Sequence, residues 1–98
     1  MLIKIHKSYR KVVAVCDSDL IGKKFEEGKM QLDVRENFYS GDEVSEEKLI
    51  EILQKEKNNY ATFNIVGEKS INCAKDAGVV ADGNVGKVDG VPFALVLL

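Results

Sequence analysis

The side chains best suited to chemistry in this chain are one histidine and two cysteines, and their spacing argues against a catalytic site. His6 is the only histidine, and a general base needs a nucleophile or a metal partner within reach. If residues 7–10 turn a hairpin, Cys16 lies at the far end of the second strand, roughly 16 Å from His6 at ~3.3 Å per residue. We therefore predict no catalytic residue. A small enzyme remains a third hypothesis, and it requires a cleft where His6, Cys16 or several carboxylates converge.

The two cysteines, Cys16 and Cys73, stand among apolar or small neighbours and form no CxxC or Cys/His pattern. Such cysteines are typical of buried, reduced thiols rather than of a secreted disulfide scaffold or a zinc site. Residues 1–7 alternate polar and apolar side chains, unlike a signal peptide, and no run approaches the roughly 20 apolar residues of a membrane span. We expect a cytoplasmic protein with no membrane contact.

An uninterrupted basic run near the N-terminus is the strongest functional signal. Bases and an exposed tyrosine on a hairpin are what phosphate contact and base stacking require. The leading hypothesis is a non-enzymatic binding module whose partner is RNA or a ribonucleoprotein. The residues expected to make this contact are Lys4, Lys7, Tyr9, Arg10, Lys11, Lys23 and Lys24. The alternative is a charged edge hairpin that only discourages aggregation, and the sequence pI of about 5.4 is low for a nucleic-acid binder.

The net charge of −2 hides an uneven distribution along the chain. Residues 1–24 sum to +4, residues 25–53 to −6 and residues 54–98 to zero. Such a split predicts separate basic and acidic faces, unless the segments lie side by side in the fold.

The acidic stretch supports a second hypothesis, a protein–protein adaptor that uses segment 33–47. Phe38, Tyr39 and Glu43 would be its contact residues, because an aromatic pair among charges suits a binding hot spot. The alternative is that both aromatic residues belong to the core. The segment has neither EF-hand order nor a D-x-D pair, so we predict a solvated face, no metal site and no cofactor.

The stretch 66–70, VGEKS, faintly echoes a phosphate-binding loop. The first glycine of that pattern is missing, and Glu68 stands where the second should be, where it would repel phosphate. The same residues loosely resemble the GxxG loop of KH domains, with Ser70 in place of the second glycine. We interpret the stretch as a strand-to-helix turn that needs Gly67 for its backbone, with simple anion binding at the helix start as the alternative.

The apolar spacing along the chain predicts alternating strands and helices. Ser45 is a good N-cap for a helix over 46–57, and Gly78 suits the end of a helix over 68–77. Asp89-Gly90 predicts a tight hairpin. Strands are expected at 2–6, 11–16, 30–34, 61–66, 85–88 and 91–98, although Asn64 in the fourth of these would alternatively cap a longer helix.

We therefore predict one domain, 1–98, of the α+β class: a two-layer α/β sandwich with a mostly antiparallel sheet and two helices on one face. The chain ends in four apolar residues, 95–98. If this last strand lies at a sheet edge, we expect a homodimer formed by strand pairing.

Five short motifs resemble the archaeal domain-of-unknown-function 424 family along nearly the whole chain. They are VAVCD (13–17), LIGKKFEEG (20–28), FYSG (38–41), NIVGEK (64–69) and VDGVP (88–92). The resemblance implies an archaeal, cytoplasmic protein with a compact two-layer α/β fold. It implies no established activity. Its pattern often carries a histidine after Val-Pro, where this chain has Phe93, so any function of that histidine is in doubt here.

Overall fold

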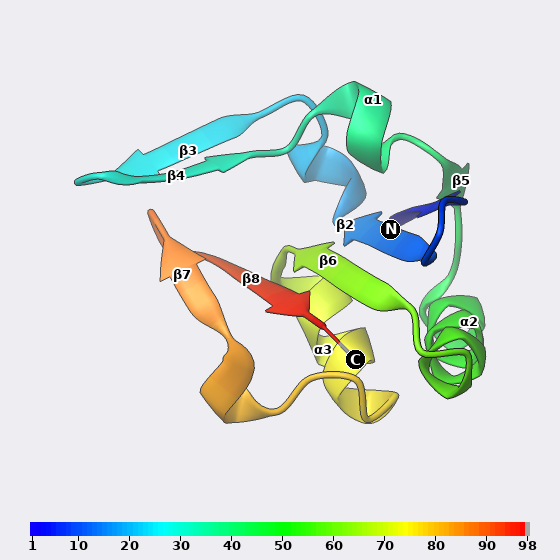
Figure 1. Ribbon diagram of the computed structural model, residues 1–98. Coiled ribbons are helices and arrows are strands. Elements are labelled where there is room, and N and C mark those ends of the chain that lie inside the picture. Colours follow the sequence, from blue (N-terminus) through cyan, green and yellow to red (C-terminus); the bar gives the residue numbers. More distant parts are fainter. Residues whose placement is uncertain (98) are drawn as a thin grey trace.

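The structure is a computed structural model that describes residues 1–97 (Figure 1). One mixed sheet has the strand order β5-β1-β2-β6-β8-β7, and a separate hairpin pairs β3 with β4. The strands are β1 (Leu2–His6), β2 (Val12–Cys16), β3 (Lys24–Glu27), β4 (Met30–Asp33), β5 (Asp42–Glu43), β6 (Thr62–Val66), β7 (Gly86–Val88) and β8 (Val91–Val96). The helices are α1 (Glu36–Tyr39), α2 (Glu46–Asn58) and α3 (Glu68–Asp76), with short 3-10 turns at Ser18–Leu20 and Asp82–Asn84.

The predicted α+β class and the mostly antiparallel sheet are confirmed. Every neighbouring pair of strands in the large sheet is antiparallel except β2 and β6. The parallel pair arises because α2 lies between β2 and β6 in the chain and returns it to the same end of the sheet.

The two predicted helices form close to their expected limits. The Ser45 hydroxyl accepts a hydrogen bond from the backbone N–H of Lys48 at the start of α2. Leu49 and Leu53 lie one turn apart and are completely buried. Gly78 has a φ of +76° after α3, which is the left-handed conformation expected at a helix end.

Both faces of the sheet are covered (Figure 1). The helices α2 and α3 pack on one face, around Val13, Phe63 and Ile65. The sequence prediction missed the cover of the other face, where α1 and the β3–β4 hairpin pack around Ala14 and Val66. The molecule therefore has a partial third layer beyond the predicted two.

The C-terminal strand lies at a sheet edge over only part of its length. β8 lies between β6 and β7, but β7 pairs only with Val91, Pro92 and Phe93, whereas Ala94, Leu95 and Val96 pair with β6 alone. Two apolar side chains are exposed here, Leu95 in β8 and Leu97 directly after the strand. Pairing of two chains through an edge strand remains a prediction.

Among residues 1–97, no helix is long and apolar enough to cross a membrane.

Candidate nucleic-acid interface

The tip of the β1–β2 hairpin carries most of the predicted contact residues. His6 pairs with Val12, so residues 7–11 connect the two strands. The hydroxyl of Ser8 donates to the carbonyl of Arg10 at 2.6 Å and closes the turn. Tyr9 has a relative exposure of 107%, so its ring projects into solvent from the end of the sheet.

A second loop, which follows α2, lies beside the hairpin tip. The backbone N–H of Thr62 donates to the carbonyl of Lys11 at 3.0 Å, and this bond ties the start of β6 to the hairpin. Tyr60 has a φ of +57°, which is uncommon for a residue that is not glycine. Its side chain is 71% exposed. Neither Tyr60 nor its neighbour Asn59 was predicted as a contact residue.

The two loops enclose an open depression of about 730 Å³. Its lining combines two exposed phenol rings, two cations, one amide and one hydroxyl. These residues are Ser8, Tyr9, Arg10, Lys11, Asn59 and Tyr60. The cations and aromatic rings of this lining suit contact with an anionic ligand that carries flat rings.

The charge at this end of the molecule is positive although the whole chain is acidic. The hairpin tip (residues 7–11) and the segment around the second loop (residues 54–62) together hold five lysines and arginines against one acid. Their sum of +4 leaves −6 for the rest of the chain, whose net charge is −2. The Lys57 ammonium donates to the carbonyl of Gly78 at 2.8 Å, so the basic feature at the tip consists of Lys7, Arg10 and Lys11.

The single acid in this region, Glu56, is buried beneath Lys11. Its relative exposure is 4%, and one carboxylate oxygen lies 3.5 Å from the Lys11 ammonium. That oxygen accepts no hydrogen bond from the described part of the chain. Lys11 therefore neutralises a buried carboxylate, which makes it a structural residue as well as a candidate contact.

We expect the variant Lys11→Met to lose stability because it leaves the Glu56 carboxylate buried without its cation. The free energy of unfolding should fall by about 1–3 kcal/mol, less than for a fully buried pair because Lys11 is partly exposed. Urea unfolding measures this loss. The double variant Lys11→Met/Glu56→Gln should recover most of it, and additive losses in the two single variants would contradict the pairing.

The other predicted cations lie apart from the tip. The Lys4 ammonium donates to the carbonyl of Asn37 at 2.9 Å and so anchors α1 to β1. Lys23 and Lys24 follow the far end of β2, with the whole strand between them and the tip. Lys24 lies 3.7 Å from the carboxylate of Glu26. The structure therefore brings together Lys7, Tyr9, Arg10 and Lys11 and separates the remaining three.

The aromatic residues predicted for an adaptor surface belong to the core. Tyr39 is 6% exposed, and burial raises the pKa of its phenol to about 12. Phe38 stacks on the His6 ring at 4.6 Å and meets Tyr39 edge-on. Neither ring is free to form an exposed hot spot.

The carboxylate of Glu43, the third residue proposed for the adaptor, is bonded to other groups of the same chain. It accepts hydrogen bonds from the Ser18 hydroxyl and lies 3.1 Å from the N-terminal ammonium of Met1. These partners lower the pKa of the Glu43 carboxyl, the Ser18 hydrogen bond most.

The groups needed for an enzyme do not converge. In the β1–β2 ladder His6 pairs with Val12 and Cys16 with Leu2, so the two side chains stand at opposite ends. His6 Nε2 lies 2.8 Å from the carbonyl oxygen of Phe38. Burial and the neighbouring Asp17 raise the pKa of the Cys16 thiol to about 11, which keeps it protonated at neutral pH. Cys73 is also free and buried, as predicted.

The start of α3 is closed to external anions because a carboxylate of the chain occupies it. Asp17 Oδ1 accepts from the backbone N–H and the hydroxyl of Ser70, at 2.8 and 2.7 Å. Asp17 Oδ2 accepts from the backbone N–H of Lys69 at 3.2 Å. Asp17 is 7% exposed. The interpretation of 66–70 as a strand-to-helix turn is therefore confirmed, and the alternative of anion binding there is wrong.

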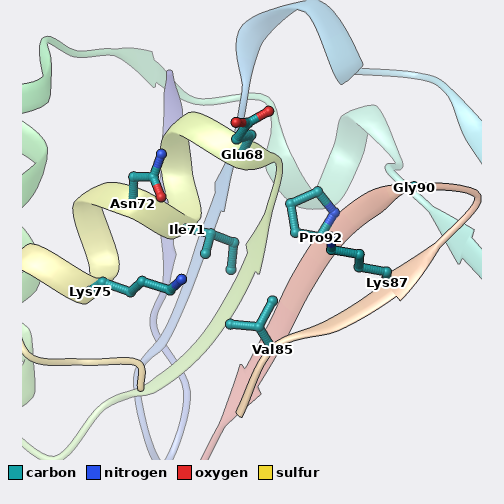
Figure 2. Close-up of a pocket in the computed structure, with 8 residues that line it drawn as sticks. All are labelled: Glu68, Ile71, Asn72, Lys75, Val85, Lys87, Gly90 and Pro92. Carbon is teal, nitrogen blue, oxygen red and sulfur yellow. The ribbon is translucent and has the colours of Figure 1, made fainter. Parts of the chain in front are cut away.

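A smaller pocket of about 270 Å³ lies between α3 and the β7–β8 hairpin. Figure 2 shows Ile71 of α3 and Val85 extending toward each other, with Lys87 and Pro92 on the opposite wall. No cysteine, histidine or serine lines it, so it offers no nucleophile and base pair. The Lys75 ammonium at its rim is already bound 2.6 Å from the Asp82 carboxylate. The pocket falls below the roughly 300 Å³ at which ligand sites usually begin.

Phe93, which follows Val91-Pro92, packs against the second core cluster. It pairs with Val66 on one side and Gly86 on the other. A Cβ atom at Gly86 would lie 2.9 Å from the Phe93 ring. The side chain therefore has a packing role in this chain.

Fold and site together define a small α+β domain with a basic, aromatic depression at one end. No group of three or more His, Cys, Asp or Glu side chains placed to hold a metal occurs within residues 1–97. The chain belongs to the DUF424 family of proteins of unknown function, whose sequence profile matches residues 5–98. This confirms the resemblance seen in its motifs.

The chain is also similar to a crystal structure described as an uncharacterized conserved protein from Methanopyrus kandleri. The two share 27% sequence identity with a TM-score of 0.85, over 98% of this chain and 90% of the other. No curated protein matches at a significant level.

Proposed function

We propose that this protein is a non-enzymatic RNA-binding module that contacts RNA phosphates through the tip of the β1–β2 hairpin. The observation that carries the proposal is the cluster of three cations, Lys7, Arg10 and Lys11, at the hairpin tip of a chain whose net charge is −2. Clustered cations attract the phosphate backbone and release its counterions, which supplies most of the affinity of non-specific binding.

The cations expected to reach phosphates are Lys7 and Arg10. Both side chains are exposed on the turn. The fully exposed ring of Tyr9 stands between them in the chain. A ring this exposed buries no surface when the chain folds, so it does not stabilise the fold. Its faces are accessible to a nucleic-acid base, on which it can stack.

The test compares two charge reversals of equal size. Lys7→Glu/Arg10→Glu and Lys23→Glu/Lys24→Glu each take the net charge from −2 to −6. Only the first pair lies at the tip. Binding of a fluorescently labelled pool of short single-stranded RNAs is followed by anisotropy at low salt.

We expect the tip variant to weaken binding by about thirtyfold or more, and the control by less than about threefold, because only the tip contacts phosphates directly. Circular dichroism and thermal unfolding verify that both variants are folded. Lys7→Glu alone, with an intermediate loss, covers the case in which the double variant is unstable. Equal losses in the two double variants, or no RNA binding by the wild type, would contradict the proposal.

A further inference from the structure

We infer that the depression between the hairpin tip and the loop after α2 holds unpaired nucleotides, with bases stacked on Tyr9 and Tyr60. This inference rests on the proposed RNA contact and specifies its form. The ligand is single-stranded RNA, or the single-stranded part of a folded RNA, rather than a duplex.

The first observation is the placement of the tyrosines. Two of the three tyrosines in the chain line this one depression, although they lie 51 positions apart in the sequence. Their relative exposures are 107% and 71%, while the third, Tyr39, is buried. Aromatic rings offer stacking surfaces to any base, but only to a base that is not already stacked inside a helix.

The second observation is the backbone of Tyr60. Its φ of +57° places a bulky residue in a conformation that favours glycine or asparagine. Tyr60 is the left-handed residue that ends α2, because its N–H donates to the carbonyl of Lys57 and the N–H of Ala61 donates to the carbonyl of Glu56, the pattern of a Schellman cap. The helix end therefore accounts for the positive φ, and the cap fixes where the Tyr60 side chain leaves the backbone. Glycine or asparagine would relieve the strain and would lose the ring.

The third observation is the polar lining between the rings. Arg10 lies in the depression and supplies charge for the phosphates that connect stacked bases, while Lys11 lines it and pairs with Glu56. The amide of Asn59 and the hydroxyl of Ser8 lie on the same lining, where they can bond base edges that a duplex would hide. The volume of about 730 Å³ is in the range of small-molecule sites and is open enough for a chain to enter and leave.

The experiment compares an oligouridylate with a blunt RNA duplex of the same length. The chain has no tryptophan, so its ultraviolet emission comes from tyrosine, and two of the three tyrosines lie in the proposed site. We expect the single strand to quench this emission and to bind at least about tenfold more tightly than the duplex, because only unpaired bases can stack on both rings.

Matched variants distinguish loss of a stacking ring from loss of folding. Tyr9→Ala and Tyr60→Asn should each weaken single-strand binding by about tenfold, while Tyr9→Phe and Tyr60→Phe should bind like the wild type. Asparagine is chosen at position 60 because it tolerates the positive φ. Duplex affinity should change little in any of the four.

The outcomes distinguish the two claims. If the wild type binds the single strand and the duplex equally, or if the alanine and asparagine variants bind the single strand normally, the stacking inference is wrong and phosphate contact alone remains. If the wild type binds neither probe, the proposed function itself fails.

Discussion

Gly67→Ala will destabilise the protein by more than about 4 kcal/mol, a large share of the 5–15 kcal/mol that holds a domain folded. A Cβ atom at position 67 would lie 2.3 Å from Asp17 Cγ and under 3 Å from both of its carboxylate oxygens. In addition, Gly67 has a φ of +108° and a ψ of 152°, a region that is open almost only to glycine. The clash and the strain act together on the buried joint between β6 and α3.

Urea unfolding followed by circular dichroism measures this effect, and Gly83→Ala is its control. Position 83 has no atom within 4 Å of an added Cβ and does not have a positive φ. The control should stay within about 0.5 kcal/mol of the wild type. A Gly67→Ala protein with near-normal stability would show that the joint is not packed as described.

Asp17→Ala should cost about 3 kcal/mol or more, because it removes one carboxylate that satisfies three donors at the start of α3. Two of those donors belong to Ser70, which is completely buried, and the third is the N–H of Lys69. Asp17→Asn keeps the shape and one acceptor oxygen, so it should cost less. The same urea titration, together with hydrogen exchange at the amide of Ser70, measures both variants.

A double-mutant cycle links the two predictions. In an Asp17→Ala background, Gly67→Ala should cost less than it does alone, because the clashing carboxylate is gone and only the backbone strain remains. Strict additivity would mean that the two residues do not share the joint, contrary to the contacts that Asp17 makes there.

Short sequence patterns predicted most of the helices and strands. The helix α2 was predictable from a cap at Ser45 and buried residues one turn apart, and the last hairpin from Asp89-Gly90, which takes φ values of +51° and +77°. The short helix α1 was missed because four residues are too few to show a helical period.

The β3 strand was missed for a different reason. The β3 sequence, Lys24-Phe25-Glu26-Glu27, has one apolar residue and three exposed charged residues, so it does not alternate as a half-buried strand does, whereas β4 was predicted from the alternation of Met30, Leu32 and Val34. The hairpin's only cover of the core comes from Phe25 and Leu32, which face each other across the hairpin. A single apolar residue in β3 leaves no period from which a strand can be predicted.

The sequence predicted the hairpin side of the candidate interface and missed the loop after α2. Lys7, Tyr9 and Arg10 are neighbours in the chain, so a local pattern predicted them. Tyr60 reaches the same depression because β6 pairs with β2, from Val12 opposite Thr62 onward, and because the N–H of Thr62 bonds the carbonyl of Lys11, 51 positions away in the sequence. No spacing rule connects such residues, and the same holds for Asp17 and the helix it caps.

The measurement that tests the central claim most directly is photocrosslinking of the protein to short single-stranded RNA containing 4-thiouridine, followed by mass spectrometry of the crosslinked peptides. The predicted result is crosslinks confined to the hairpin tip, residues 7–11, and to the loop at Asn59 and Tyr60 that shares its depression. Lys7→Glu/Arg10→Glu should abolish them, and Lys23→Glu/Lys24→Glu should leave them unchanged. Crosslinks elsewhere on the molecule, or none at all, would contradict the assignment of this surface to RNA.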